Sequence, residues 1–273
     1  MKNFTILVCL YEKDIKSSDT LKSLLENHMV LKNSNINIWD NSVNVMISSQ
    51  LCFLNERFNN LTYTHTPENL TLSKIYNKIA VNQTNKNGYL ILLEDDSILP
   101  INFFQEIFSQ TQKYNNINLF LPQINSGHKL ISPARDFVFK TSYFRKLEKG
   151  VLNSAQVTAI NSGMVISNRV FIDGFSYDER LRFYGTDNYF MYNYSQKYSE
   201  IYVLEAVIHH DLSFKSTKRL ERKIQIFKEI KRANRIIYSN SFVKKNIVIF
   251  SNFISAIKLS FKNKTLSFFE NYD

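Results

Sequence analysis

The sequence predicts an α/β fold, in which helices wrap a mostly parallel sheet. Short apolar runs alternate with amphipathic helical patterns through the first 100 residues, which is typical of parallel strands joined by helical crossovers. Right-handed crossovers bring the carboxyl ends of such strands to one edge of the sheet. Polar side chains follow three of the runs, at Tyr11, Asp40 and residues 94–96. We therefore expect these side chains to gather at that edge.

The elements follow one another in a regular order. Apolar runs predict strands at residues 4–10, 36–39, 61–64 and 89–93. Apolar residues at helical spacing predict helices from a cap near residues 17–19, over 43–58, over 69–81 and after Pro100. A further strand is expected at 117–121, an irregular excursion at 125–149, and strands at 157–160, 164–166, 201–204 and 206–208. A short helix is expected from Arg169, and a longer helix is expected over 188–198.

The composition fits a folded protein that works in a reducing compartment. Of the 273 residues, 44% are hydrophobic, and Gly (6) and Pro (4) are too scarce for a turn-dense sandwich. The two cysteines, Cys9 and Cys52, make neither a disulfide framework nor a metal-site spacing. The first residues do not resemble a signal peptide, and no apolar run reaches the roughly 18 residues of a spanning helix. We therefore expect a cytoplasmic protein.

The positive charge is concentrated at the end of the chain. The net charge is +10, and residues 211–273 hold 14 Lys and Arg against 5 Asp and Glu, so the preceding residues are nearly neutral. Two helical patterns, over 216–238 and 242–261, carry apolar faces in this region. Residues 214–273 therefore form a basic amphipathic helical extension. Its apolar face suits either an anionic membrane surface or a helical hairpin that packs on the body.

Three carboxylates follow the strand at 89–93, and we call residues 94–96 the acidic turn. Close carboxylates repel one another, and hard divalent cations prefer such oxygen ligands. A solvated acidic turn after a buried strand is the alternative that these residues alone leave open.

Further motifs accompany the acidic turn in a defined order. They are Leu10-Tyr11-Glu12, Asp40-Asn41-Ser42, Asn69 with Asn77, Leu93-Glu94-Asp95-Asp96-Ser97, Ser162-Gly163, Gly174 to Asp178-Glu179, Asp187, and His210-Asp211-Leu212-Ser213. In this order and spacing, residues 4–213 resemble the family-2 glycosyltransferases of the GT-A fold, especially the bacterial rhamnosyltransferase-like branch. Two departures are Glu94 in place of the usual first Asp, and Tyr177 as the aromatic residue beside Asp178.

The resemblance implies a nucleotide-diphosphate sugar donor, with UDP or dTDP, and a divalent cation, Mn²⁺ or Mg²⁺. It implies a nucleotide-sugar-binding half at 1–100 and an acceptor-side half at 101–213. The donor-binding residues that it implies are Tyr11, Asp40, Asn69, Asn77 and Asp95. The metal-binding residues that it implies are Asp96, Glu94 and His210, with His209 as the alternative histidine. Asp40 as a turn residue, and Asn69 and Asn77 as a cap and a polar helix face, remain open.

The resemblance makes Asp187 the catalytic base of an inverting transfer, which must take the proton of the acceptor hydroxyl. At a helix start, the helix dipole would lower its pKa. A simple helix cap is the alternative role of Asp187. Asp178 and Glu179 either bind acceptor hydroxyls or hydrogen-bond within their turn.

We therefore predict a metal-dependent inverting glycosyltransferase that acts on a bacterial surface glycan, as an oligosaccharide or lipid-linked acceptor. It would work in the cytoplasm, with the option of peripheral contact at the inner face of the cell membrane. A nucleotidyltransferase is one alternative, but residues 11–16 are not the Gly- and Lys-rich phosphate loop that it would carry. A nucleic-acid-binding protein is another, suggested by a pI ≈ 9.4. Confinement of the charge to the extension speaks against it.

Overall fold

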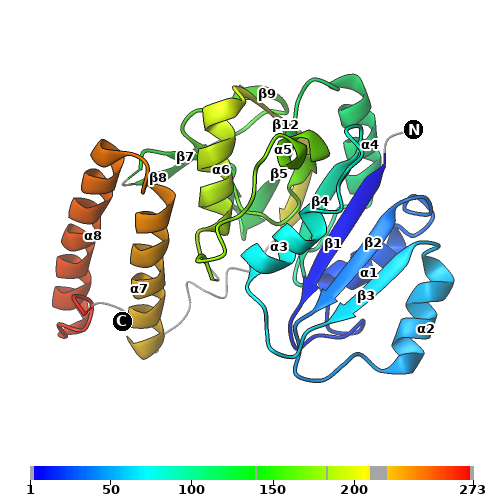
Figure 1. The fold of residues 1–273 in the computed structure, drawn as a ribbon, viewed down its shortest axis with the longest axis horizontal. Coiled ribbons are helices and arrows are strands. Elements are labelled where there is room, and N and C mark those ends of the chain that lie inside the picture. Colours follow the sequence, from blue (N-terminus) through cyan, green and yellow to red (C-terminus); the bar gives the residue numbers. More distant parts are fainter. Residues whose placement is uncertain (1–2, 139, 183, 210–219, 271–273) are drawn as a thin grey trace.

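The computed structural model describes residues 3–138, 140–182, 184–209 and 220–270. Within them, one large sheet is covered by helices on both faces, and a two-helix hairpin lies at one end (Figure 1). The strand order is β3-β2-β1-β4-β11-β5-β12-β9, with β6 paired to β5. The strands of this sheet are β1 (Phe4–Leu10), β2 (Asn35–Asp40), β3 (Leu61–His65), β4 (Tyr89–Glu94), β5 (Leu119–Ser126), β6 (Lys129–Ser132), β9 (Gly150–Asn153), β11 (Val165–Ser167) and β12 (Glu200–His209).

The sheet is mostly parallel, as predicted. β1 pairs in parallel with β2 and β4, β2 with β3, and β12 with β5. β11 runs antiparallel between β4 and β5. β9 and β6 add antiparallel pairings. The six mutually parallel strands therefore end at the same edge of the sheet.

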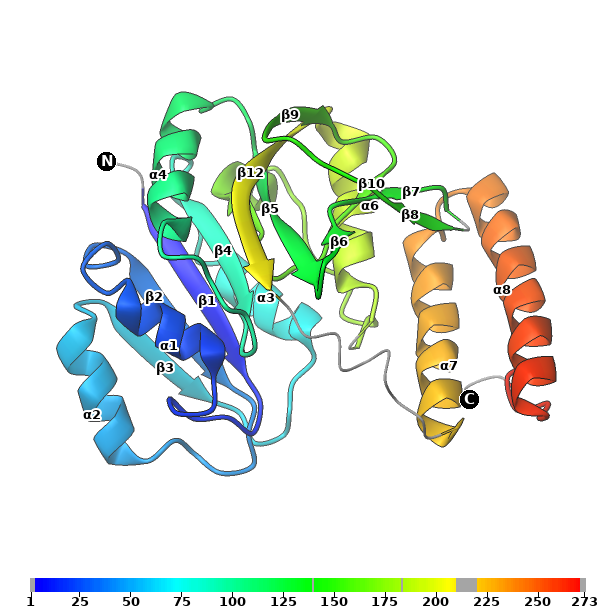
Figure 2. The same cartoon turned by 180° about the vertical axis from the view of Figure 1, so that it is seen from behind.

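Alternation along the buried strands gives the sheet two apolar faces. Ile6 and Val8 of β1 point into the core that packs under α1 (Asp19–Glu26), α2 (Ser48–Arg57) and α4 (Phe103–Lys113). Leu7 and Cys9 point into the core under α3 (Leu72–Ala80), α5 (Asn168–Ile172) and α6 (Thr186–Lys197). Figure 2 shows α1 and α4 in front of the sheet, and Figure 1 shows α3 and α6 on the opposite face. Continuous apolar runs in β1 and β4 are what burial on both faces requires.

Several element boundaries differ from the sequence predictions. The helix expected over 43–58 begins at Ser48, and the one expected over 69–81 begins at Leu72. The two short strands expected at 201–204 and 206–208 are one strand, β12, with an irregularity between Val203 and Val207. The apolar periodicity located these elements but not their ends, because loop residues continue the pattern.

The excursion expected at 125–149 contains regular structure. Gly127, with φ of 58°, turns the chain from β5 into β6. A second, three-stranded sheet follows, in the order β10-β7-β8. Its strands are β7 (Ala134–Asp136), β8 (Thr141–Tyr143) and β10 (Val157–Thr158). The prediction of an irregular segment was wrong here, because very short strands carry too little alternation to be recognised.

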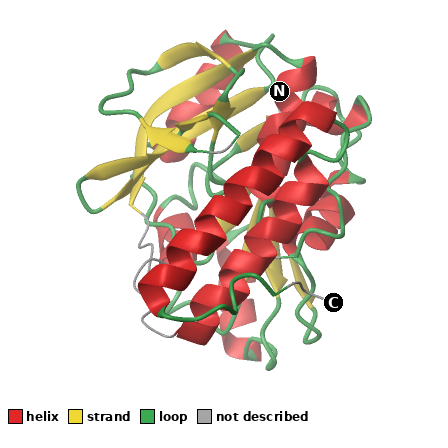
Figure 3. Ribbon diagram, turned by 90° about the vertical axis from the view of Figure 1, so that its left-hand side faces the viewer, coloured by secondary structure: helices red, strands yellow, loops and turns green. Residues whose placement is uncertain are grey.

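The basic extension forms a hairpin of two long helices, α7 (Leu220–Ile237) and α8 (Phe242–Asn263), which lie side by side (Figures 1 and 3). α7 lies between α6 and α8 (Figure 1). Ala233 and Ile237 of α7 pack with Leu181 before α6. A Cβ added to Gly185 would lie 2.7 Å from the Cβ of Ala233, so α7 approaches the start of α6 closely. None of the helices in the described ranges is both long and apolar enough to cross a membrane.

Candidate active site

The carboxyl ends of β1, β2 and β4 meet at one point of the sheet edge. Leu10 of β1 is in register with Asp40 of β2, and Cys9 is in register with Glu94 of β4. A pocket of ≈ 540 Å³ opens there, and we call it the edge pocket. From the sheet side it is lined by Cys9, Leu10, Tyr11, Asn41, Asn69, Leu70, Leu72, Glu94 and Asp95. From the far side it is lined by Arg182, Tyr184, Arg222, Gln225, Ile226 and Glu229.

Asp95 joins the loop after β1 to the acidic turn. One carboxylate oxygen accepts the Tyr11 backbone N–H at 3.0 Å, and the other lies 2.9 Å from the Lys13 ammonium. Its carbonyl accepts the Ser18 hydroxyl at 2.8 Å. Burial raises the pKa of Asp95, although the Lys13 ammonium and the Tyr11 amide act in the opposite direction. Asp95 therefore lines the edge pocket while it braces two strand ends.

The backbone of the acidic turn is held by α1 and by the chain before β11. Thr20 of α1 donates its hydroxyl to the Glu94 carbonyl and accepts the Ser97 backbone N–H at 2.9 Å. The Ser97 hydroxyl lies 2.5 Å from the Ser162 hydroxyl. These contacts hold Glu94 and Asp96 at the sheet edge on a fixed backbone. The Ser162-Gly163 motif thus supports the acidic turn from behind.

The acidic turn has the ligand chemistry of a divalent-cation site. Glu94 and Asp96 are half-buried carboxylates on either side of Asp95, whose own carboxylate binds Lys13 and the Tyr11 amide. Mg²⁺ typically takes one or two carboxylates together with substrate phosphates, so two carboxylates suffice. Among the described residues, no cluster of three or more His, Cys, Asp and Glu side chains is arranged to hold a metal. The residues present fit a cation that shares its coordination with a bound ligand.

His210 lies outside the described residues. Its neighbour His209 is exposed at the end of β12 and forms a bridge with Ile98, two residues beyond Asp96. The chain at residue 209 is therefore next to the acidic turn. Metal ligation by either histidine stays a prediction.

Asp40, at the end of β2, is not among the residues that line the edge pocket. Its side chain is buried, and its two oxygens accept the Ser42 backbone N–H at 2.9 Å and the Tyr63 hydroxyl at 2.6 Å. Burial and the Asp40 contact raise the pKa of Tyr63 to about 12. Asn41, the next residue, lines the pocket instead. The direct contact of Asp40 with the nucleotide base stays a prediction, and the geometry draws attention to Asn41.

The two asparagines of the predicted donor site lie in different places. Asn69 lines the edge pocket and has a positive φ of 52°. Asn77 on α3 instead accepts the Tyr177 backbone N–H at 2.8 Å and donates to the Tyr177 carbonyl at 2.9 Å. Its amide also lies 3.2 Å from a carboxylate oxygen of Glu179. The structure thus places Asn77 as a brace for the segment that precedes α6.

Asp178 forms its contacts within its own turn. It accepts the Arg180 backbone N–H at 2.9 Å and pairs with the Arg180 guanidinium at 2.5 Å. The hydrogen bond to Arg180 lowers the pKa of Asp178. Glu179 contacts Asn77, as described above. Both residues belong to the segment before α6, and their contact with an acceptor stays a prediction.

Asp187 is the second residue of α6, and the helix is capped by Gly185 with a φ of 84°. The alternative role of Asp187 as the cap is therefore wrong. Its carboxylate accepts the Asn188 backbone N–H at 2.8 Å. We expected the helix dipole to lower its pKa, but burial outweighs that effect and raises the pKa of Asp187. A carboxylate with a raised pKa is a better proton acceptor, which suits a general base.

Asp187 and Glu94 lie near the same buried tyrosine. Burial raises the pKa of Tyr76, and the charges of Glu94 and Asp187 act in the same direction. The negative charge of Asp187 also raises the pKa of Tyr177. Asp187 is not among the residues that line the edge pocket. The arrangement brings the edge pocket, the acidic turn and the Asp187 carboxylate to one region, through segments far apart in the sequence.

Arg182, Tyr184 and α7 form a wall of the edge pocket that the sequence did not predict. The motifs gave no signal for these residues, because the extension carries only an amphipathic pattern. That α7 and the ends of β1 and β4 line the same pocket is visible only once the fold is known.

No protein-family profile and no curated protein sequence matches the chain. Solved structures do match it. TarS 1-349 of S. aureus in complex with UDP-GlcNAc has a TM-score of 0.61 at 13% identity, over 91% of this chain and 69% of that chain. The same TarS fragment in complex with UDP has a TM-score of 0.57 at 11% identity, over 97% and 92%. GalNAc-T7 with UDP, GalNAc and Mn²⁺ has a TM-score of 0.52 at 13% identity, over 77% and 44%.

These neighbours have the GT-A fold, and this chain has it too. The chain spans 65% of another TarS 1-349 structure and 39% of a longer TarS structure. At such low identities the likeness establishes the fold and carries no residue-level assignment.

Proposed function

We propose that the chain is a glycosyltransferase that uses a nucleotide-diphosphate sugar as its donor. The observation that carries the proposal is the edge pocket, which lies where β1, β2 and β4 end and is lined by Glu94 and Asp95 of the acidic turn. Ligands of open α/β sheets bind at this edge. The GT-A neighbours solved with UDP-GlcNAc or UDP support the same ligand class.

In this proposal, the nucleotide lies against the ends of β1 and β2. The exposed ring of Tyr11 packs on the base, and Asn41 and Asn69 present polar groups to it from the pocket wall. Asp40 supports this wall through Tyr63 and Ser42. Asp95 keeps Tyr11 next to the acidic turn.

A divalent cation, Mn²⁺ or Mg²⁺, completes the site. Glu94 and Asp96 would hold it, with His210 as a further ligand. The cation supplies the positive charge that neutralises the diphosphate leaving group. The GT-A neighbour GalNAc-T7, which was solved with Mn²⁺, supports this part of the proposal.

Asp187 is the base in an inverting transfer. Its raised pKa keeps its proton affinity above that of an ordinary aspartate, so the carboxylate accepts the proton of the acceptor hydroxyl. Asp178 and Glu179 orient acceptor hydroxyls at the neighbouring turn. The transferred sugar is a hexose or a deoxyhexose, as in the rhamnosyltransferase-like branch, and the acceptor is a bacterial surface glycan.

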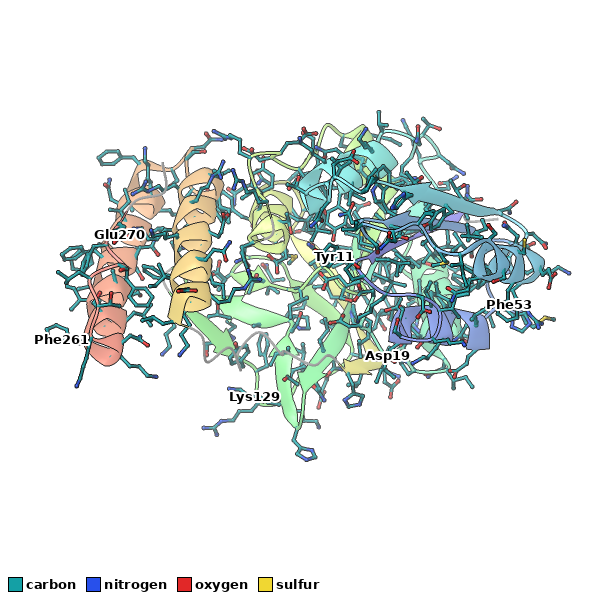
Figure 4. All side chains as sticks on the ribbon, turned by 90° about the horizontal axis from the view of Figure 1, so that it is seen from below. Tyr11, Asp19, Phe53, Lys129, Phe261 and Glu270 are labelled. Carbon is teal, nitrogen blue, oxygen red and sulfur yellow. The ribbon has the colours of Figure 1, made fainter. Side chains whose placement is uncertain are left out.

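The α7–α8 hairpin makes contact with an anionic membrane at the inner face of the cell, where a lipid-linked acceptor would be present. α8 exposes a strip of large apolar side chains, with Phe242, Phe250 and Phe261 at 83%, 67% and 82% exposure. Phe261 lies at the outer margin of the molecule, away from Tyr11 (Figure 4). The same helix carries Lys244, Lys245, Lys258 and Lys262, so α8 combines apolar and basic groups.

A donor screen tests the enzymatic proposal. The protein is incubated with a panel of UDP- and dTDP-sugars and Mn²⁺, and release of the nucleoside diphosphate is measured. Slow hydrolysis of one donor, which Asp96→Ala abolishes, is the expected result. Absence of hydrolysis and of binding across the panel would contradict the proposal.

A vesicle experiment tests the membrane contact separately. Binding to vesicles with anionic lipid should exceed binding to neutral vesicles, and Phe250→Glu with Phe261→Glu should remove it. Equal binding of the wild type to both vesicle types would reject this contact and leave the donor site untouched.

A further inference from the structure

Helix α7 forms part of the wall of the edge pocket. Arg222, Gln225, Ile226 and Glu229 line the pocket from three successive turns of this helix. Arg182 and Tyr184, from the segment before α6, line the pocket beside them. The basic extension therefore reaches the ends of β1 and β4, although it is far away in the sequence.

The position of α7 at the pocket is fixed by packing. Ala233 and Ile237 are buried against Leu181, and Gly185 leaves just enough space for Ala233. At the end of the helix, the Tyr238 hydroxyl lies 3.3 Å from the carboxylate of Asp136 on β7. Contacts near the start of α6 and with β7 therefore fix the position of α7.

The pocket wall on the α7 side carries two arginines and one carboxylate, Glu229, whereas the charged side chains on the sheet side are the carboxylates Glu94 and Asp95. Arg182 and Arg222 are the basic side chains among the described residues that line the pocket. The ammonium of Lys13 is bound to Asp95 at 2.9 Å. A diphosphate next to Glu94 and Asp95 would be repelled by their charges, so positive charge on the opposite wall would favour its binding in addition to the proposed cation.

The two arginines are placed to supply that charge. Arg182 is half exposed, and its guanidinium lies 3.9 Å from a carboxylate oxygen of the nearly buried Glu229, which is beyond hydrogen-bond distance. Arg222 bonds through one guanidinium nitrogen to the neutral side chain of Gln225 at 3.1 Å. Both guanidinium groups therefore keep donors for a ligand. Their planar forks match phosphate oxygens, with which they form paired hydrogen bonds.

We propose that Arg182 and Arg222 bind the diphosphate of a nucleoside diphosphate ligand from the α7 side of the edge pocket. Glu229 positions Arg182 for this contact. The C-terminal hairpin then contributes a ligand-binding residue, Arg222, to the donor site. This inference rests on the proposed donor class, and it assigns the diphosphate contacts to residues outside the sequence motifs.

Calorimetric titration of UDP and of uridine tests the inference. The wild type is compared with Arg222→Gln, with Arg182→Gln and with the control Arg235→Gln, which removes an exposed arginine from the last turn of the same helix. Each titration is made with Mn²⁺ and with a chelator. Loss of one charge-assisted phosphate contact should weaken UDP binding about tenfold. Affinity for uridine should stay within about twofold, and the control should bind UDP like the wild type.

The outcomes separate the inference from the proposed function. Wild-type affinity for UDP in both pocket variants would overturn the inference and leave the donor class standing. Equal losses for uridine and UDP would also overturn it, because they indicate a general change in the pocket. A wild type that binds neither UDP nor dTDP would overturn both. Thermal unfolding of each variant shows whether α7 remains docked.

Discussion

The backbone amide of Tyr11 donates a hydrogen bond of 3.0 Å to the carboxylate of Asp95. This bond joins the end of β1 to the turn after β4, across 84 residues of sequence. Lys13 binds the other carboxylate oxygen at 2.9 Å, so one side chain holds two segments of the pocket wall. Asp95 therefore has a structural role in addition to its place in the pocket.

The Lys13–Asp95 pair should contribute measurably to stability. Both side chains are partly buried, at 30% and 17% exposure, so solvent screens the pair less than an exposed one. Because burial also raises the pKa of Asp95, the pair is measured by its coupling energy, with Asp95→Asn and Lys13→Ala as the two single variants. A double-mutant cycle with Lys13→Ala should give a coupling energy of about 1 kcal/mol. The more exposed Lys22–Asp19 pair is the control and should give less than about 0.5 kcal/mol. Equal coupling in both pairs would contradict this role.

Asp96→Ala should remove the effect of Mn²⁺ on nucleotide binding. In the wild type, Mn²⁺ should raise the affinity for UDP, because the cation bridges carboxylates and phosphate. In the variant, titrations with and without Mn²⁺ should give the same affinity. Glu26→Ala removes an exposed carboxylate from the last turn of α1 and is the control. An intact Mn²⁺ effect in Asp96→Ala would place the cation on other residues.

Asp187→Asn should abolish sugar transfer while UDP binding persists, because the amide cannot accept the acceptor proton. The rate of the wild type should fall as the pH drops through the raised pKa of Asp187, because the base becomes protonated. A rate-against-pH profile with its acid limb above the ordinary Asp value of 3.8 is the expected measurement. Full activity in the variant would place the base elsewhere.

The same substitution should change the pH dependence of stability. Burial raises the pKa of Asp187 in the folded state, so the folded protein binds this proton more tightly than the unfolded chain. The contribution of this carboxyl to stability is complete below the unfolded value of 3.8 and is lost as the pH rises through the folded value. In Asp187→Asn the side chain does not ionise, so this loss of stability at higher pH does not occur. The variant should therefore gain stability relative to the wild type at neutral pH, and the gain should shrink in acid.

Asn77→Ala should destabilise the fold through the segment before α6. The side chain makes two hydrogen bonds to the backbone of the buried Tyr177, and their loss should cost about 1–3 kcal/mol. If Asn77 is only a brace, UDP affinity should change by less than about twofold, and denaturant unfolding should show the loss. A large loss of UDP affinity with unchanged stability would support the donor contact that the family resemblance implies.

Much of the sheet could be predicted, because burial on both faces forces continuous apolar runs in β1 and β4. Parallel pairing then places Tyr11, Asp40 and the acidic turn at one edge, and the structure shows that arrangement. The burial of Asp40 outside the pocket lining could not be predicted, because its partner Tyr63 comes from a separate strand. The strands β7 and β8 were not predicted, because three residues are too few to show the alternation of apolar and polar residues that marks a strand.

The pocket wall formed by α7 also could not be predicted from the sequence. The amphipathic pattern of residues 220–237 shows that one face packs, but not on what. The residue that allows the close approach, Gly185, lies in a different segment. The predicted boundary at residue 213 stays a prediction, and the proposed role of Arg222 gives a reason to keep the extension in any functional assay.

Thermal unfolding with UDP and dTDP, with and without Mn²⁺, tests the proposed donor site most directly. A ligand that binds only the folded state raises the unfolding temperature by mass action. We expect the unfolding temperature to rise more with a nucleoside diphosphate and Mn²⁺ together than with either alone. In Asp96→Ala, Mn²⁺ should add nothing to the rise that the nucleotide causes. No rise with either nucleotide, in the presence or absence of Mn²⁺, would contradict the proposal that the edge pocket holds a nucleotide-diphosphate sugar.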